Sequence, residues 1–335
     1  MRQRSLRIGF SVAISLVFLY FALRGIEWDQ ALQAFAQAQY GYVLPIIAVT
    51  VWQLYIRAQR WRVLVRQMGE PPMSTLVAAT NIGWMANFVL PLRAGEIIRP
   101  VLLRRKENKP LGGVLATIAL ERIFDMFTIL LLFGVTAALM PFSEEVGRWG
   151  NRLLTLAVVV AAGIAFVRWR SVLALRLLDF VLRPLPENIG KPIRSFFEGF
   201  LDALRILDSP VAFLQLVGWS LYLWLVVSCI FGLGMLMFGL DAPLLLGQVV
   251  LTVIVAVAVS APSAPGFIGA FQVGCVIALG IFGVSKDEAV AYSLALHVTQ
   301  FIAIIGAGLF SLAQQGMSLQ QFSEVSDEHG AESRG

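Results

Sequence analysis

The sequence predicts an all-α, polytopic helical membrane protein with about six full crossings, two re-entrant broken hairpins and an inverted-topology repeat. Of its 335 residues, 58% are hydrophobic and 14% are charged, and the mean hydropathy is +0.77. Soluble domains have roughly 25% charged residues, so this composition excludes a soluble globular chain. Apolar stretches of about 20 residues, the length that crosses a hydrocarbon core, recur along the chain.

Six apolar stretches are predicted to be full crossings. They span 8–23, 41–59, 111–140, 153–167, 211–238 and 289–313. The first follows the basic start MRQRSLR and resembles a signal-peptide core, but the RGIEWDQ after it offers no small-residue cleavage site. It is therefore predicted to be retained as a helix.

Two further apolar regions, 76–103 and 243–282, are interrupted in the middle by proline and glycine. Each is predicted to be a re-entrant hairpin that enters and leaves on the same side of the membrane. The alternative is an eight-helix bundle with two Pro-kinked crossings, since neighbouring helices can satisfy the freed backbone groups.

The distribution of arginine and lysine decides the orientation. A single crossing by 76–103 places the basic residues of 57–66 and of 104–109 on opposite sides, against the positive-inside rule. A re-entrant path puts both groups, and those of 168–205, in the cytoplasm. With 243–282 entering from outside, the sequence predicts a multi-pass protein of the cytoplasmic (inner) membrane with N- and C-termini cytoplasmic.

An inverted repeat follows from this topology. Residues 41–140 and 211–313 each read as crossing, broken hairpin, crossing, with opposite orientation. The breaks, Pro91 to Gly95 and Pro262 to Gly266, both read PxxxG at matching offsets. Broken hydrophobic segments at corresponding positions of inverted repeats indicate a transporter site near the bilayer midplane.

The predicted domain organisation is one integral membrane domain, 1–313. The segment 168–210 between the repeats is predicted to be a linker with an amphipathic helix that lies on the cytoplasmic interface, because apolar residues recur there at helical spacing. The polar end of the chain, 314–335, is predicted to be a disordered cytoplasmic tail.

Six charged residues lie where the chain is otherwise apolar. They are Arg93, Glu96 and Arg99 at the first break and Glu121, Arg122 and Asp125 in the third crossing. Each unpaired central charge costs about 2.5 to 3.5 kcal/mol, so six would cost roughly 15 to 21 kcal/mol. They must be paired or hydrated, and we predict that Glu96 or Glu121 faces Arg93 or Arg122.

The charged residues admit two interpretations. In the functional one, they accept a lipid headgroup while the acyl chains stay in lipid, Arg93 and Arg122 contact its phosphate, and half-helix N-termini near Gly95 and Gly266 add positive dipole ends. In the structural one, they form a closed ion-pair network that joins the repeats. His297 is expected to be hydrogen-bonded to a neighbour, with a proton relay as the alternative.

Several motifs together resemble the lysylphosphatidylglycerol synthase transmembrane (flippase-like) family. They are Asn87-Phe-Val-Leu-Pro91 with Gly95-Glu96, Glu121-Arg122 with Asp125, Ser-Ala-Pro265-Gly266 with Gly269, and Arg60-Trp61. The resemblance covers about residues 8–315. It implies an inner-membrane protein related to the part of these synthases that moves lipid between leaflets. The aminoacyl transfer of the family belongs to a separate soluble domain, which is expected to be absent here.

Two sets of candidate site residues result. The substrate-binding candidates are Asn87, Arg93, Glu96, Arg99, Glu121, Arg122, Asp125, Gln272 and His297. The helix-break candidates are Pro91, Gly95, Pro262, Pro265, Gly266 and Gly269. The family usually has a second glycine where this chain has Phe267, a glutamate at Gln272 and an arginine at His297, which makes the second repeat less charged.

The leading functional hypothesis is translocation, by flipping or scrambling, of a phospholipid or lipid-linked intermediate with an anionic headgroup. The chain is expected to be no enzyme and to need no cofactor or metal, since no Walker, DxD-like or nucleophile motif accompanies Glu121 and Asp125, and Cys229 and Cys275 form no CxxC pair. The expected partners are membrane lipids and no nucleic acid, and a homo-oligomer is left open. The alternatives are a small-solute transporter and a membrane enzyme acting on a lipid-linked substrate.

Overall fold

A computed structural model describes residues 17–20, 22–90, 93–139, 144–260 and 265–316. Every regular element in these ranges is helical. The α-helices are α2 (Trp28–Gln37), α3 (Val43–Val65), α4 (Met73–Val89), α5 (Gly95–Glu107), α6 (Leu111–Leu139), α7 (Glu144–Trp169), α8 (Ser171–Leu182), α9 (Glu187–Ala203), α10 (Pro210–Phe238), α11 (Leu244–Ser260), α12 (Ala270–Gly280) and α13 (Lys286–Gln314). Short 3-10 turns include η3 (Leu204–Asp208) and η4 (Pro265–Phe267). The prediction of an all-α membrane protein is confirmed.

Four helical segments in the described ranges are long and apolar enough to cross a membrane. They are Tyr40–Met68, Gly150–Trp169, Pro210–Phe238 and Lys286–Gln314. Each contains or overlaps a predicted crossing. Of the first predicted crossing, the described residues 17–20 and 22–23 are helical. The chain is a multi-pass membrane protein.

The two interrupted regions each form a pair of helices, as predicted. The first pair is α4 and α5, and the second is α11 and α12, which η4 precedes. Both predicted repeats then contain the same series: a long helix, a helix of 17 residues, a break, a short helix and a helix of 29 residues. Pro91 and Pro262 lie outside the described residues.

The chain divides into two compact units. Unit 1 comprises residues 1–55, 80–96 and 222–316, and unit 2 comprises 56–79, 97–221 and 317–335. The helices α3, α4, α5 and α10 contribute residues to both units.

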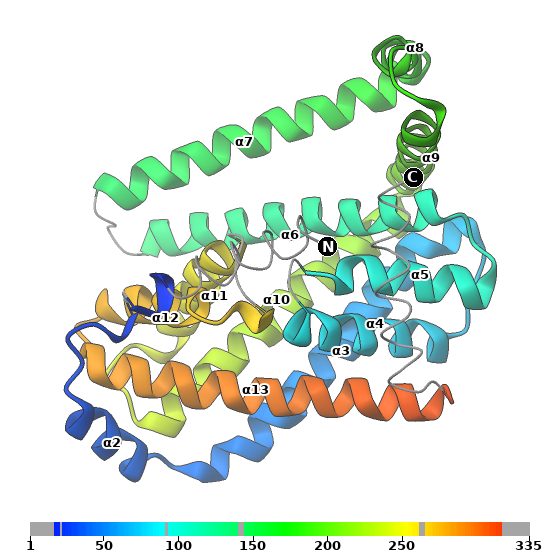
Figure 1. Cartoon of the computed structure of the whole chain (residues 1–335). Coiled ribbons are helices and arrows are strands. Elements are labelled where there is room, and N and C mark those ends of the chain that lie inside the picture. Colours follow the sequence, from blue (N-terminus) through cyan, green and yellow to red (C-terminus); the bar gives the residue numbers. More distant parts are fainter. Residues whose placement is uncertain (1–16, 21, 91–92, 140–143, 261–264, 317–335) are drawn as a thin grey trace. The chain divides into compact units, whose positions relative to one another are not determined.

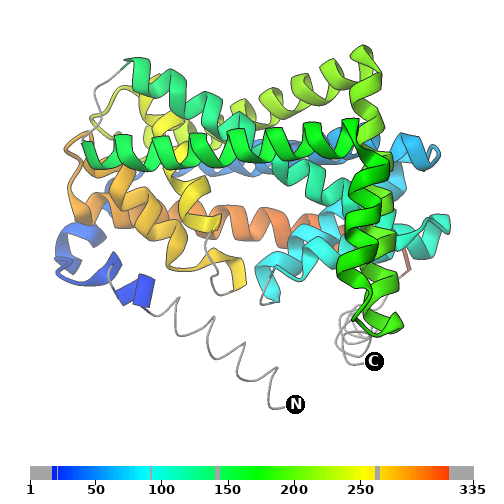
Figure 2. The same cartoon turned by 90° about the horizontal axis from the view of Figure 1, so that it is seen from above.

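Unit 1 is held together by α13. The helix begins at a capping box in which Ser285 and Glu288 bond reciprocally. Its first residues also hold the segment before α2, because Lys286 Nζ donates to the Arg24 carbonyl at 2.6 Å and Asp287 accepts from the Glu27 amide at 2.9 Å. Figure 1 shows α2 at one end of α13, and Figure 2 shows α11 and α12 side by side as a hairpin.

Unit 2 is built on α6, which packs closely against α9. A Cβ added at Gly199 in α9 would lie 2.4 Å from the Gly113 Cα in α6, and one added at Gly112 would lie 2.5 Å from Ser195 Oγ. Only small residues permit this approach of two backbones. The predicted linker, 168–210, contains α8, α9 and η3. Its residue Leu204 is fully buried and belongs to the hydrophobic core of unit 2.

The helix α7 follows α6 in the chain and moves away from it along its length. It runs back antiparallel to α6 and diverges from it toward its C-terminal end (Figure 1). After Trp169 the chain turns sharply at Arg170, whose backbone is not helical, into α8 (Figure 2). The space between the diverging helices is bounded by η3 and α10.

Candidate functional site

A network of arginines and carboxylates lies in unit 2. Glu121, which has no exposed surface, pairs with Arg99 through Nη1 at 2.7 Å and with Arg60 through Nε at 3.6 Å. Arg60 Nη1 also binds Asp125 Oδ1 at 2.5 Å. Arg122 Nη2 lies 3.5 Å from Asp125 Oδ2. The two carboxylates, one turn apart on α6, therefore hold arginines from three helices, α3, α5 and α6.

Neighbouring groups fix the orientation of Arg99. Its guanidinium carbon lies 3.8 Å from the centre of the Trp61 ring, a cation–π geometry. The Trp61 indole donates in turn to Thr117 Oγ1 at 2.9 Å. Trp61 has no exposed surface, so Arg99 is clamped between a fixed ring and Glu121.

The network carries more positive than negative charge. Its six members are Arg57, Arg60, Arg99, Arg122, Glu121 and Asp125. Arg57 is 7% exposed and within electrostatic reach of Asp125. Four arginines and two carboxylates give these six a formal charge of +2. Arg122 is the most accessible member, with 38% of its side chain exposed.

The predicted pairing was that Glu96 or Glu121 faces Arg93 or Arg122. Glu121 instead pairs with Arg99, in the second half of the first broken hairpin, and with Arg60. Arg57 and Arg60 were missed as members of this network, because the sequence suggested that both belong to a basic cytoplasmic group, 57–66, at the end of the crossing. The helix α3 instead continues to Val65. Arg57 and Arg60 are three residues apart and so lie on one face of a helix, and apolar residues follow them. This pattern could have indicated that both arginines are buried.

The first break lies in unit 1. The Asn87 side-chain oxygen accepts the Gly95 amide at 2.8 Å and so caps the start of α5. Arg93 has a left-handed backbone, with φ of 53°, and its Nη1 lies 3.7 Å from Glu96 Oε1. The prediction that Glu96 faces Arg93 is therefore confirmed.

Arg93 also connects the first break to the second hairpin within unit 1. It donates a hydrogen bond to the carbonyl oxygen of Val259, near the C-terminal end of α11. Its guanidinium carbon lies 5.4 Å from the centre of the Phe267 ring, which follows the second break. A cation at the end of a helix, where carbonyls lack partners, is electrostatically favourable.

The second break has a neutral polar pair. The Gln272 side-chain oxygen accepts the Gly269 amide at 2.7 Å, and its amide nitrogen lies 2.9 Å from His297 Nδ1. His297 packs on the Phe271 ring, with ring centres 4.7 Å apart. The expected hydrogen bond between His297 and a neighbour is confirmed. Gly266 has a positive φ of 68°, a conformation that glycine adopts without strain.

The two repeats thus use one plan with different charge. In each, a side-chain amide oxygen caps the helix after the break, Asn87 in the first and Gln272 in the second. In each, that helix is joined to the following 29-residue helix by a polar pair. This is the ion pair Arg99–Glu121 in the first repeat and the hydrogen bond Gln272–His297 in the second.

The site residues expected from the sequence form two groups. Asn87, Arg93, Glu96, Gln272 and His297 lie in unit 1. Arg99 and the three charged residues of α6 lie in unit 2. That Arg93 and Glu96 meet the charged residues of α6 stays a prediction. Among the described residues, no three His, Cys, Asp or Glu side chains are grouped as a metal site requires.

Comparisons with known proteins give two relatives. Over 95% of its length the chain is 24% identical to a protein named glycosyltransferase AglD, from Haloferax volcanii, and it spans about half of that relative, 55%. It is also 21% identical over 69% of its length to a protein named UPF0104 membrane protein MJ1078, from Methanocaldococcus jannaschii, of which it covers 95%. No solved structure matches. The lysylphosphatidylglycerol synthase TM region family matches residues 8–308, and the chain belongs to this family.

Proposed function

We propose that this protein translocates a phospholipid or a lipid-linked intermediate with an anionic headgroup across the cytoplasmic membrane. The observation that carries the proposal is a buried network of four arginines and two carboxylates in unit 2, whose member Arg122 is partly exposed. Ionisable side chains are costly inside a membrane, and where they occur they usually belong to a binding or transport site. An anionic headgroup is the ligand that a partly exposed arginine of this network can bind.

Arginine suits this role because its planar guanidinium donates two parallel hydrogen bonds to phosphate oxygens. In the proposed mechanism the phosphate binds Arg122 first, while Glu121 and Asp125 hold Arg60 and Arg99 in place. The acyl chains stay in the bilayer. The protein performs no covalent chemistry on the lipid, and transport runs down a gradient or is coupled to an ion.

The membership of a family named for lysylphosphatidylglycerol synthase supports a lipid as the transported molecule. The name of the Haloferax relative supports a second candidate, a membrane enzyme that transfers a sugar, although the chain spans 55% of that relative. Incubation of the purified protein with sugar donors and a lipid extract separates the two, because a transferase forms a new covalent product and a translocase does not.

The test is the dithionite accessibility of fluorescent phosphatidylglycerol and phosphatidylethanolamine in proteoliposomes. Wild type is expected to expose inner-leaflet phosphatidylglycerol. Arg122→Gln should slow the exposure, because it removes the accessible cation but leaves the Arg60–Asp125 pair. Arg122→Lys, which keeps the charge, should retain part of the activity.

Arg104→Gln is the matched control, because Arg104 is an exposed arginine in α5 outside the network. It is expected to behave as wild type. If Arg122→Gln and Arg104→Gln give equal rates in folded protein, the network is no headgroup site. If folded wild type exposes neither lipid, unassisted scrambling of these lipids is excluded.

A further inference from the structure

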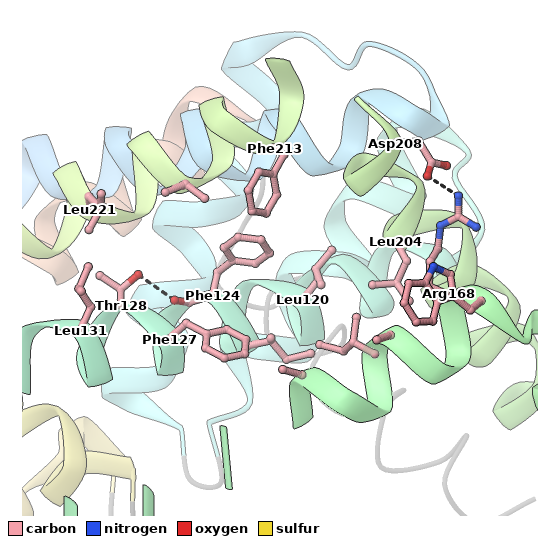
Figure 3. Close-up of a pocket in the computed structure, with 16 residues that line it drawn as sticks. Leu120, Phe124, Phe127, Thr128, Leu131, Arg168, Leu204, Asp208, Phe213 and Leu221 are labelled. Atoms are coloured by element: carbon pink, nitrogen blue, oxygen red, sulfur yellow. Dashed lines mark hydrogen bonds and ion pairs between the residues drawn. The ribbon is translucent and has the colours of Figure 1, made fainter. Parts of the chain in front are cut away.

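Unit 2 contains an apolar cavity of about 670 Å³ between α6, α7, η3 and α10. Figure 3 shows Leu131 and Leu221 at one end of it and the ion pair of Arg168 and Asp208 at the other. Apart from this pair and Thr128, the lining side chains are apolar. The cavity is thus an apolar slot with one charged end.

The dimensions of the slot match those of an acyl chain. On α6 its lining runs from Leu120 to Leu131, which at 1.5 Å per residue is roughly 16 Å. One leaflet contributes about half of a hydrocarbon core of about 30 Å. The volume lies within the range of about 300 to 1,000 Å³ that is usual for ligand pockets. The Thr128 hydroxyl bonds the Phe124 carbonyl at 2.8 Å, so this polar group needs no ligand.

The charged end of the slot coincides with the ends of two membrane spans. Trp169 ends the span of α7 and Arg168 precedes it, while Asp208 ends η3 just before the α10 span begins. Tryptophan and arginine are typical of the headgroup level of a bilayer. Trp169 is 85% exposed and Leu131 is 54% exposed, so the slot opens to the surface of the protein.

We propose that this slot binds one acyl chain of a phospholipid with a zwitterionic headgroup, whose phosphate contacts Arg168 and whose ammonium contacts Asp208. The facing pair has no net charge, so a headgroup that carries both charges matches it, whereas a purely anionic headgroup is repelled by Asp208. The acyl chain fills the slot and makes dispersion contacts with its lining. Inside a bilayer, such contacts are the main source of favourable binding free energy.

This site is separate from the arginine–carboxylate network. Leu120 and Phe124 line the slot, whereas Glu121 and Asp125, on the same helix, point into the network. Binding in the slot requires no movement of lipid between leaflets. The proposal therefore holds or fails independently of the proposed function.

Photolabelling of the full-length protein in nanodiscs tests the acyl-chain part. The probe is phosphatidylethanolamine with a diazirine in its acyl chain, and labelled peptides are identified by mass spectrometry. Label is expected on peptides that contain Phe124 or Phe213. Ala165→Trp fills the slot and should reduce this labelling by about tenfold, equivalent to roughly 1.4 kcal/mol of binding free energy.

Ala162→Trp is the matched control, since Ala162 lies on the same helix, is exposed and does not line the slot. It is expected to label as wild type. Equal labelling of the two variants, or wild-type label confined to other helices, overturns the proposal. Thermal unfolding verifies the fold of each variant, and if Ala165→Trp does not fold, the smaller change Ala161→Phe takes its place with the same expected loss.

Competition by unlabelled lipids tests the headgroup part. Against wild type, phosphatidylethanolamine should compete better than phosphatidylglycerol. Arg168→Gln and Asp208→Asn should each reduce this preference by roughly two- to fivefold, the range of a partly exposed ion pair. Equal competition by the two lipids against wild type would contradict the zwitterionic assignment.

Discussion

Glu121 is the carboxylate on which the network depends, because it holds both Arg60 and Arg99 with no exposed surface of its own. We expect Glu121→Gln to destabilise the protein by about 3 to 5 kcal/mol, since the change leaves buried cations without their partner. Thermal unfolding in detergent measures this. Glu70→Gln is the control, because 71% of the Glu70 side chain is exposed and its loss should change little. An equal midpoint for both variants would mean that Arg60 and Arg99 are neutralised by other groups.

Gly95 occupies a position at which no side chain fits. A Cβ there would lie 1.7 Å from the Gly83 carbonyl oxygen and 2.7 Å from Asn87 Oδ1, the atom that caps α5. Because a backbone oxygen cannot move aside alone, Gly95→Ala is expected to cost at least about 1 to 3 kcal/mol. The measurement is the shift of the unfolding midpoint.

Gly134→Ala provides the comparison for Gly95. Nothing lies within 4 Å of a Cβ at Gly134, which is inside α6, so this change should be neutral or slightly stabilising. If Gly95→Ala unfolds at the same temperature as Gly134→Ala, the distance between Gly95 and the Gly83 carbonyl must be larger than in this structure.

At the level of single residues, the sequence predicted that the deep charges are paired, because unpaired charges are costly in hydrocarbon. It included the pair of Arg93 with Glu96 but not the partners of Glu121, which are Arg99 and Arg60. Asn87 was expected to bind substrate, and the structure gives it a capping bond to Gly95. Such a bond depends on backbone geometry at the break, which no residue pattern encodes.

At the level of elements, the crossing of α6 and α9 brings two helix backbones of unit 2 close together. Gly199→Ala is expected to disrupt it, because the new methyl group would lie 2.4 Å from the Gly113 Cα. We expect a lowered unfolding temperature and faster amide exchange in α9. Gly190→Ala, on the same helix and with nothing within 4 Å, should leave both unchanged. Equal exchange in the two variants would show that α9 does not depend on this crossing.

Most elements could be predicted because a membrane-spanning helix is recognisable in a sequence as a long stretch of apolar residues. The breaks were found from proline and glycine within apolar runs, and α4, α5, α11 and α12 confirm them. The helix α2 was missed, since its ten residues are too short and too polar for a span. Its position depends on bonds from the start of α13 to the segment before it, far away in sequence.

At the level of the whole molecule, the predicted inversion of the repeats gives opposite sides for corresponding loops. Glu70 lies between the first helix and the broken hairpin of one repeat, and Asp241 lies at the equivalent place in the other; both are exposed. In a variant with Cys229 and Cys275 changed to alanine, Glu70→Cys should react with a membrane-impermeant maleimide from the cytoplasmic side only. Asp241→Cys should react from the outer side only. Labelling of both from one side would show that the repeats are parallel.

The orientation and the joining of the two units could not be fixed from sequence alone. Both depend on contacts between segments far apart in the chain, whereas periodicity and charge counts report each segment by itself. The repeat could be proposed because it needs only the order of elements, and the matching lengths of α4 with α11 and of α6 with α13 support it.

If the arginine–carboxylate network carries an anionic lipid, as proposed, the transport has an electrical consequence. A lipid that carries one negative charge takes that charge through the membrane field, so its movement generates a current. An interior-negative potential of 100 mV favours the outward direction by about 2.3 kcal/mol per charge, close to fiftyfold. A zwitterionic lipid gains nothing from the same field. If the protein translocates an anionic lipid as proposed, the membrane potential is therefore sufficient to set the direction of that transport on a chain that carries no Walker motif.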